Sequence, residues 1–231
     1  MTYVISDIHG YSFEKIMLLL QMTEFGKNDS LFVLGDVIDR GDDGVKMLQW
    51  MITQPNVKLI LGNHEAMLLS CDFIFDEIND SVFPKLNTKK VSLLNTWQFN
   101  GASPTLRELN VLSAAKRKII LEYLREAPLY DSATVNGRRF LFTHSGLGHF
   151  DKHRKMQDYD RDDLLWNRPK SDTRYFDDMT VVFGHTPTLK YGEQHRGKIL
   201  KTDTWIDIDT GAAIGYPPTL LCLDTMREIH L

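Results

Sequence analysis

Three short apolar runs near the start of the chain each end in polar side chains bracketed by glycine. The runs are residues 3–5, 31–34 and 57–61, and the polar clusters that follow them are residues 6–10, 35–41 and 62–65. In an open α/β sheet, ligands bind outside the carboxyl ends of the strands. This repeated pattern therefore predicts three strands of one sheet, with a functional site at their carboxyl ends.

The segments that join these runs have helical spacing. Apolar residues recur at helical intervals in residues 13–20 and 45–51, and Ser12 is a good N-cap for the first of these helices. The alternation of strands and helices predicts parallel strands with right-handed crossovers. From residue 76 to about 128 the strand pattern stops, and helical spacing recurs around residues 91–99, 105–109 and 114–126. We interpret this stretch as a helical insert beside the sheet, suited to substrate selection.

The second half of the chain is again rich in predicted strands. Asn136-Gly137 separates residues 130–135 from residues 139–143 and is typical of a type I′ hairpin turn. Further strands are expected at 180–183, 205–208 and 220–223, and we assign the last two to a second sheet. The predicted fold class is α/β, with two packed mixed β-sheets flanked by helices. We expect one domain over residues 1–231, with the helical insert at about 76–128.

Composition narrows the range of partners. The 231 residues carry a net charge of -4, which gives no reason to expect nucleic-acid binding. The chain enters its first predicted strand almost at once, and no apolar stretch is long enough to span a bilayer. Cys71 and Cys222 lie far apart in hydrophobic stretches, as expected for free thiols in a reducing compartment. These features predict a cytoplasmic protein without a membrane partner.

Side chains that bind metal ions lie at five predicted strand ends. They are Asp7, His9, Asp36, Asn63, His144 and His185. Residues i and i+2 leaving a strand point the same way, so Asp7 and His9 can bind one ion together. Asp36 can bridge this ion to a second one, which the remaining three residues would hold. Carboxylate, imidazole and amide donors without thiolate favour Mn²⁺, Fe or Zn²⁺ over softer ions.

The charges in this predicted site indicate a phosphate substrate. Two dications set against two aspartates and a bridging hydroxide leave an excess of about one positive charge. Arg40 and Arg168 would add to it, and a guanidinium fork matches phosphoryl oxygens better than an ammonium does. His64 is then free for acid–base work, and Asp39 is placed to orient its ring and favour the imidazolium.

The same motifs resemble those of a known enzyme family. Residues 6–10, 35–41 and 62–65 look like the three signature motifs of metal-dependent phosphoprotein phosphatases, in their small bacterial and phage branch. His144-Ser145-Gly146 and Gly184-His185 resemble the two remaining metal-histidine motifs. The resemblance implies a calcineurin-like metallophosphoesterase sandwich. It also implies that Asp7, His9 and Asp36 hold one ion, and that Asp36, Asn63, His144 and His185 hold the other.

The resemblance implies a function as well. Arg40 and Arg168 would bind phosphate, the latter on a looser Trp-x-Arg pattern, and His64 with Asp39 would protonate the leaving oxygen. We therefore expect a phosphomonoesterase, specifically a Ser/Thr protein phosphatase of broad specificity acting on phosphorylated proteins or peptides. It would use two divalent ions, with Mn²⁺ expected and Fe or Zn²⁺ as alternatives, and attack by a metal-bridging hydroxide.

Two alternatives use the same residues differently. A dinucleoside polyphosphate hydrolase of the diadenosine tetraphosphate type would share the metal chemistry and need extra basic or aromatic groups for the nucleotides. The Asp39-Arg40 pair resembles the protein phosphatase pattern more closely, which favours the first reading. A catalytically silent phospho-binding module should have lost a ligand or an acid, whereas every such position is filled here.

Overall fold

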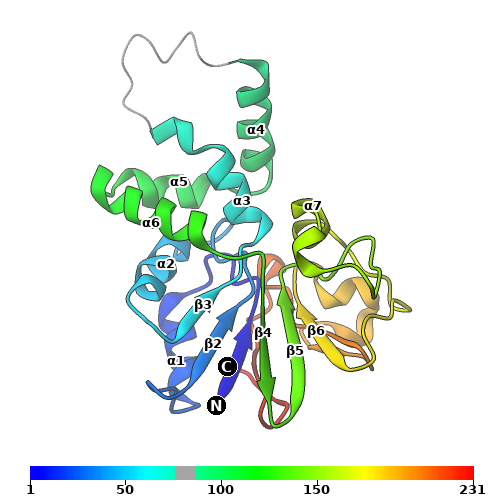
Figure 1. The fold of residues 1–231 in the computed structure, drawn as a ribbon. Coiled ribbons are helices and arrows are strands. Elements are labelled where there is room, and N and C mark those ends of the chain that lie inside the picture. The colour runs from blue at the N-terminus through cyan, green and yellow to red at the C-terminus, as the bar shows by residue number, and fades with distance from the viewer. Residues whose placement is uncertain (76–86) are drawn as a thin grey trace.

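The first sheet holds the three strands that carry the glycine-bracketed clusters. The computed structural model describes residues 1–75 and 87–231. The strand order is β10-β9-β1-β2-β3, with β1 Thr2–Ile5, β2 Ser30–Val33, β3 Val57–Leu59, β9 Leu220–Cys222 and β10 Arg227–Ile229. β1 pairs in parallel with β2, and β2 with β3. The predicted parallel arrangement is confirmed, and the carboxyl ends of these strands meet at one edge (Figure 1).

The assignment of residues 220–223 to the second sheet is wrong. β9 pairs antiparallel with β1, with Tyr3 opposite Cys222 and Val4 opposite Leu221, and β10 pairs with β9. Backbone groups on the edge of β1 away from β2 need partners, and all three residues of β9 are buried. A distant strand therefore completes this edge, and the order of elements along the chain does not reveal it.

The second sheet contains the predicted hairpin. Its order is β4-β5-β6-β8-β7, with β4 Tyr130–Val135, β5 Arg138–Thr143, β6 Met179–Phe183, β7 Leu200–Lys201 and β8 Trp205–Asp207. Asn136 and Gly137 both have positive φ, at 50° and 78°, as a type I′ turn requires. β5, β6 and β8 run parallel, whereas β4 and β7 are antiparallel to their neighbours. The sheet is therefore mixed, as predicted.

The two sheets pack face to face around one apolar layer. Alternate residues of each strand point into it, and the rings of Phe32 and Phe142 lie 4.3 Å apart between their centroids. Val4 lies in this layer, whereas its neighbours Tyr3 and Ile5 face the other side of the first sheet. The predicted fold class, α/β with two packed mixed sheets flanked by helices, is confirmed.

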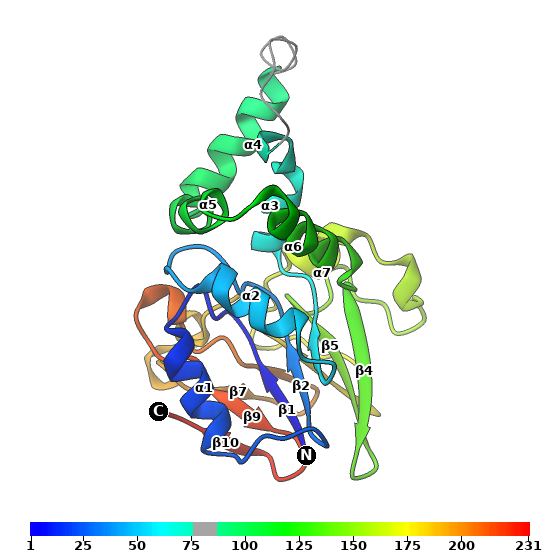
Figure 2. The same ribbon diagram turned by 90° about the vertical axis from the view of Figure 1, so that its left-hand side faces the viewer.

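Helices cover the outer faces of the sheets. α1 Phe13–Gln21 and α2 Gly44–Ile52 pack on the first sheet through their buried apolar residues (Figure 2). The side chain of Ser12 accepts a hydrogen bond from the Lys15 amide, so the predicted N-cap is confirmed. α7 Arg161–Leu165 lies beside the second sheet. Within the described ranges, none of the helices combines the length and apolarity needed to cross a membrane.

Helices also fill the described part of the predicted insert. α3 Asn63–Ser70 begins inside the third polar cluster, and α4 Thr88–Phe99, α5 Ser103–Asn110 and α6 Ala114–Glu126 follow. Figures 1 and 2 show these helices gathered above the carboxyl ends of the first sheet. The start of the predicted insert, residues 76–86, lies outside the described residues.

Candidate metal centre and active site

The loops that follow β1 and β2 are bonded to each other through their backbones. The amides of Asp7, His9 and Gly10 donate to the carbonyls of Gly35, Asp36 and Val37, at 3.1, 2.8 and 2.8 Å. A Cβ on Gly10 would collide with the backbone of Gly41, so only glycine permits this approach. The sequence motif thus uses glycine to bring two ligand-bearing loops together.

Residues with positive φ are concentrated in the loops that follow the strands. Among the described residues, ten non-glycine residues have positive φ, and six of them are predicted site residues. The six are Asp7, His9, Asp36, Asp39, Arg40 and His185, with φ between 47° and 72°. Such conformations cost energy and persist where the surrounding contacts over-determine them, as happens at functional sites.

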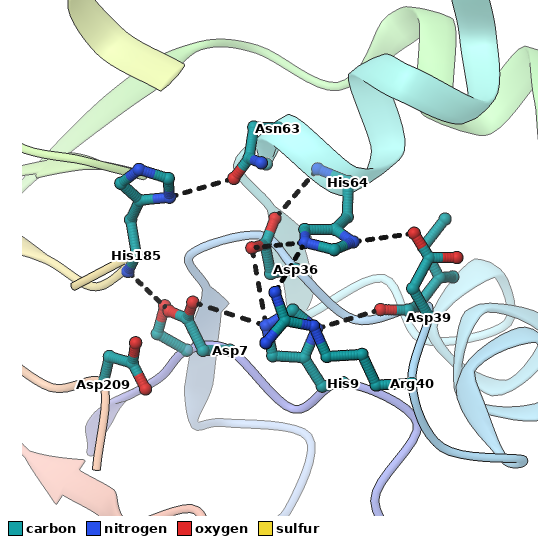
Figure 3. A network of polar contacts seen from close by, with 12 residues as sticks. Asp7, His9, Asp36, Asp39, Arg40, Asn63, His64, His185 and Asp209 are labelled. Carbon is teal, nitrogen blue, oxygen red and sulfur yellow. Dashed lines mark hydrogen bonds and ion pairs between the residues drawn. The ribbon is translucent and has the colours of Figure 1, made fainter. Parts of the chain in front are cut away.

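The first group of predicted ligands surrounds Nε2 of His9. This atom lies 3.6 Å from Asp36 Oδ2 and 3.9 Å from Asp7 Oδ1 (Figure 3). The ring is oriented by its other nitrogen, Nδ1, which donates to the carbonyl of Ile38 at 3.2 Å. A backbone carbonyl on Nδ1 leaves Nε2 unprotonated and available to a metal ion. All three side chains are buried.

The second group brings together Asp36, Asn63, His144 and His185. Nε2 of His144 lies 2.8 Å from Asn63 Oδ1 and 3.4 Å from Asp36 Oδ1. Nδ1 of His185 lies 3.0 Å from the same amide oxygen, and Nε2 of His185 is buried without a hydrogen-bond partner among the described residues. The four side chains come from the ends of β2, β5 and β6 and from the first turn of α3.

These contacts fit a cation better than a hydrogen-bond network. Nδ1 of His144 donates to the Leu34 carbonyl at 2.7 Å, so Nε2 is an acceptor, and it faces the amide oxygen of Asn63, another acceptor. The described residues contain two sets of possible metal ligands, His9-Asp36-His64 and Asp36-His144-His185. Within each set, one donor atom per residue lies within 4.8 Å of the others. Burial, with the charge on Asp7, raises the pKa of Asp36 well above its usual value. A divalent cation would offset that repulsion, so the residues fit the predicted pair of ions.

His64 forms a buried pair with Asp39. Its Nδ1 donates to Asp39 Oδ2 at 2.7 Å, and its Nε2 lies 3.8 Å from Asp36 Oδ2. Burial lowers the pKa of His64 well below its ordinary value, and the charges of Arg40 and His144 act in the same direction. Burial also raises the pKa of Asp39 to about 6. Burial thus disfavours the charged form of each partner, whereas the sequence suggested that Asp39 favours the imidazolium of His64.

The two predicted arginines lie on a cavity that opens at the metal-ligand clusters. One guanidinium nitrogen of Arg40 lies 3.4 Å from His64 Nε2. Arg168 donates to the carbonyl of His185 at 3.1 Å and to the hydroxyl of Thr186 at 3.2 Å. Both side chains line the cavity, which has a volume of about 1010 Å³ and also exposes His9, Asp36, Asn63 and His185. The structure thus brings all the predicted site residues to one place, and their roles stay predictions.

Glu65 has a larger role than the sequence suggested. From the sequence alone, a glutamate just after Gly62-Asn63-His64 is expected at a helix start, where the helix dipole favours its charge. The carboxylate is fully buried and accepts hydrogen bonds from the amides of Asp36, Val37, Ile38 and Gly62, at 2.8 to 3.3 Å. It therefore joins the loop after β2 to the loop after β3. Its place inside the third polar cluster is the only local signal of this function.

Sequence reasoning also missed two buried carboxylates, Asp207 at the end of β8 and Asp209 just after it. Asp209 lines the cavity and is 2% exposed, and Asp207 is fully buried. Burial raises the pKa of Asp209 well above its usual value, and the nearby charge of Asp7 adds to the shift. Figure 3 places the two carboxylates of Asp7 and Asp209 next to each other. The signal was present, because an apolar strand here again ends in aspartates followed by Gly211.

Two curated relatives of this chain carry the same name. This chain is 30% identical over 148 residues to the symmetrical bis(5'-nucleosyl)-tetraphosphatase of Buchnera aphidicola subsp. Baizongia pistaciae. The match covers 63% of this chain and 44% of that protein. The protein of the same name from Proteus mirabilis is 31% identical over 136 residues, which cover 58% and 48% of the two chains. The matches therefore span about half the length of these curated relatives.

Solved structures share the fold. A crystal structure provisionally assigned as a diadenosine tetraphosphatase superposes with a TM-score of 0.65 at 18% identity, over 100% of this chain and 92% of that one. A cold-active protein-tyrosine phosphatase of a psychrophilic Shewanella species gives 0.55 at 18% identity, over 98% and 76%. At this identity the likeness concerns the fold alone.

The relatives overturn the expectation of a Ser/Thr protein phosphatase. Proteins named symmetrical bis(5'-nucleosyl)-tetraphosphatase match this chain at 30 and 31% identity, which contradicts the phosphoprotein phosphatase assignment and gives no support to phosphorylated protein substrates. The physical reason is that the roles predicted for the metal ligands, the arginines and the His64–Asp39 pair would serve any phosphoryl transfer of this kind. The Asp39-Arg40 pair therefore cannot discriminate between the two substrates.

The family is clear even though the substrate was misread. The model of calcineurin-like phosphoesterases matches residues 2–208, which contain every predicted ligand and both sheets apart from β9 and β10. This family works with a dinuclear centre of divalent ions, in agreement with the two clusters around Asp36. The chain belongs to the calcineurin-like phosphoesterase family.

Proposed function

We propose that this chain is a metal-dependent hydrolase of dinucleoside polyphosphates, of the diadenosine tetraphosphate type. The observation that carries the proposal is the extent of the cavity beyond the ligand clusters. A single phosphate would occupy only the part next to Arg40 and Arg168, but the cavity continues along Lys170 and Lys190. A polyphosphate chain offers negative charge along the whole of such a wall.

Apolar groups at the outer part of the cavity support the same proposal. Trp166 is 42% exposed and Ile214 is 51% exposed, and both line the cavity. An exposed indole offers a flat surface to a nucleobase, and base–aromatic stacking is sequence-tolerant. The rings of Trp166 and His185 are nearly perpendicular, with their centroids 6.0 Å apart, so the indole lies beside the candidate metal centre.

The cofactor would be two divalent ions, with Mn²⁺ expected. Asp7, His9 and Asp36 would hold one ion, and Asp36, Asn63, His144 and His185 the other. When bound, the ions would neutralise charge on the phosphate and lower the pKa of bound water. The first sheet and the first turn of α3 supply Asp7, His9, Asp36 and Asn63, whereas the second sheet supplies His144 and His185.

The remaining residues of the chain act on the phosphate and on the leaving group. Arg40 and Arg168 would bind the oxygens of the phosphoryl group that is transferred to water. The bond to the bridging oxygen breaks, and His64 gives a proton to the departing nucleoside diphosphate. Asp39, at 2.7 Å from the ring, holds His64 in the orientation that this transfer needs.

A substrate panel tests the proposal. Protein loaded with Mn²⁺ is assayed with diadenosine tetraphosphate, a phosphoserine peptide and p-nitrophenyl phosphate, and the products are separated by anion-exchange chromatography. We expect the highest kcat/KM on diadenosine tetraphosphate, with two molecules of adenosine diphosphate formed per substrate. A higher kcat/KM on the phosphopeptide, or no cleavage of the dinucleotide, would contradict the proposal. Chelated protein is the control for metal dependence.

A further inference from the structure

Two buried side chains of the helical insert end on Asp39. The indole nitrogen of Trp97, on α4, donates to Asp39 Oδ2 at 2.8 Å, and the hydroxyl of Thr105, on α5, donates to Asp39 Oδ1 at 2.6 Å. Trp97 and Thr105 are both 0% exposed. Each oxygen of the carboxylate therefore has a donor that the insert provides.

These bonds leave Asp39 a single orientation. Oδ2 accepts from Trp97 and from Nδ1 of His64, and the amide of Asp39 donates back to the hydroxyl of Thr105 at 2.9 Å. The Thr105 hydroxyl is thus bonded both to the backbone and to the side chain of the same residue. Rotation of the carboxylate would break at least one buried charge-assisted hydrogen bond, which is a strong type of contact.

The insert also holds the strained backbone at this point. Asp39 and Arg40 have φ of 70° and 72°, and the Arg40 amide donates to the carbonyl of Gly101 at 2.9 Å. Glu108, on α5, accepts from the amides at the start of α2, at 3.1 and 3.2 Å. Helices α4 and α5, with the turn between them, therefore bond to the Asp39-Arg40 pair and to the start of α2, which follows it.

We propose that Trp97 and Thr105 are positioning residues that aim His64 at the leaving oxygen by fixing Asp39. The proposal rests on the proposed function for its leaving group, but the contacts that carry it are independent of the substrate. It gives the helical insert a role in the chemistry itself, in addition to any role in substrate selection. The insert thus supports the His64–Asp39 pair, although its two contacting residues lie 58 and 66 positions from Asp39 in sequence.

The test uses substitutions that keep the shape and remove the donors. Trp97→Phe and Thr105→Val are compared with wild type as metal-loaded enzymes on diadenosine tetraphosphate. We expect kcat to fall roughly tenfold for each, a part of what general acid catalysis contributes, with KM nearly unchanged. Thr105→Ser, which keeps the hydroxyl, should restore most of the lost kcat. Wild-type kcat in both donor-deleting variants would overturn the proposal.

A second readout does not depend on turnover. In Zn²⁺-loaded protein, the Nδ1 proton of His64 that bonds to Asp39 is followed by NMR and assigned by its disappearance in His64→Asn. It should shift in Trp97→Phe and in Thr105→Val. Trp205→Phe is the matched control, because Trp205 is also 0% exposed and donates its indole proton at 2.9 Å, but to the carbonyl of Thr173.

The two readouts separate the proposals from each other. An unshifted His64 proton in both donor-deleting variants contradicts the positioning role, and so does an equal shift in Trp205→Phe. Failure of the wild-type enzyme to cleave diadenosine tetraphosphate would instead remove the proposed substrate, while the NMR comparison would still decide whether the insert fixes Asp39. Thr105→Val replaces the hydroxyl by a methyl group and Thr105→Ser keeps the hydroxyl, so this pair tests the donor independently of any packing defect in Trp97→Phe.

Discussion

The strand-end loops and the helical insert build the candidate site in different ways. The loops after β1 and β2 supply several site residues from short runs of sequence and are bonded to each other through their backbones, as between His9 and Asp36. Helices α4 and α5 instead reach Asp39 with two single side chains, which are 58 and 66 residues away from it in sequence. The loops bring the metal ligands together, and the insert acts through a residue that the loops supply.

This difference predicts which property each region controls. Changes in the strand-end loops should affect metal binding, because the six predicted ligands follow β1, β2, β3, β5 and β6. Changes in the insert should affect proton transfer and leave the metal centre intact. Glu65 belongs to the first region by this criterion, since its carboxylate bonds the loop after β2 to the loop after β3.

The largest effect should come from Asp36→Asn. Among the described residues, Asp36 alone belongs to both clusters of donor atoms, and it lies 3.6 Å from His9 and 3.4 Å from His144. We expect the amide to abolish measurable turnover of diadenosine tetraphosphate, whereas His185→Ala should weaken one site and leave some activity at high Mn²⁺. Equal activity of the two variants across a Mn²⁺ titration would contradict the bridging role of Asp36.

Arg40→Lys should have the next largest effect. Arg40 has a positive φ, and one of its guanidinium nitrogens lies 3.4 Å from His64 Nε2. Its side chain lines the cavity, so its fork of donors is placed for the phosphoryl oxygens. Lysine keeps the charge but loses the fork, and we expect a loss of roughly 10²-fold in kcat/KM, as for other preorganised donors. Inhibition by inorganic phosphate is the second measurement, and inhibition unchanged from wild type would remove this role.

Glu65 and Glu108 allow the two regions to be compared by the free energy of unfolding that each glutamate contributes. Glu65→Gln places an amide donor among four backbone amides and should lower the free energy of unfolding by about 1–3 kcal/mol, because a buried donor is left unpaired. Glu108, on α5, is half-buried and accepts from the amides at the start of α2, so Glu108→Gln should cost about 0.3–1 kcal/mol, the value of a charge at a helix N-terminus. Urea denaturation of both variants measures the difference. A larger loss for Glu108→Gln would reverse the comparison.

The smallest effect should come from the cationic wall of the cavity. Lys170 and Lys190 are exposed, so each alanine variant should raise KM for diadenosine tetraphosphate only about two- to fivefold. KM for p-nitrophenyl phosphate, which carries a single phosphate, should not change. The effect should shrink as salt increases, because screening weakens exposed charges. An equal rise of KM for both substrates would show that Lys170 and Lys190 do not bind the polyphosphate chain.

The parts of the site that the sequence predicted are those that local patterns encode. Asp7, His9 and Asp36 directly follow apolar strands, and glycines mark the turns that only glycine can make. Trp97 lies in a stretch of helical spacing, as a packing residue would, and nothing near it in sequence points to Asp39. Its indole meets that carboxylate only through tertiary packing. Thr105 has no local signal for the same reason.

The fold shows the same limit. The parallel order of β1, β2 and β3 follows from the alternation of strands and helices, and the Asn136-Gly137 hairpin follows from turn chemistry. β9 was placed in the wrong sheet because a short, fully buried strand fits either one. The phosphoprotein phosphatase expectation failed because the residues predicted for phosphoryl transfer do not distinguish a phosphopeptide from a dinucleotide.

His64 is the residue on which the division between the two regions depends. Its Nε2 lies 3.8 Å from Asp36 and it falls within a cluster of donor atoms with His9, yet we assign it to proton transfer and not to metal binding. The most direct test is the metal content of His64→Asn after reconstitution with Mn²⁺, measured by mass spectrometry beside wild type and Asp36→Asn. We predict that His64→Asn keeps about two ions per chain, as the wild-type dinuclear centre does, and that Asp36→Asn does not. Loss of an ion from His64→Asn would make His64 a ligand and would contradict the account.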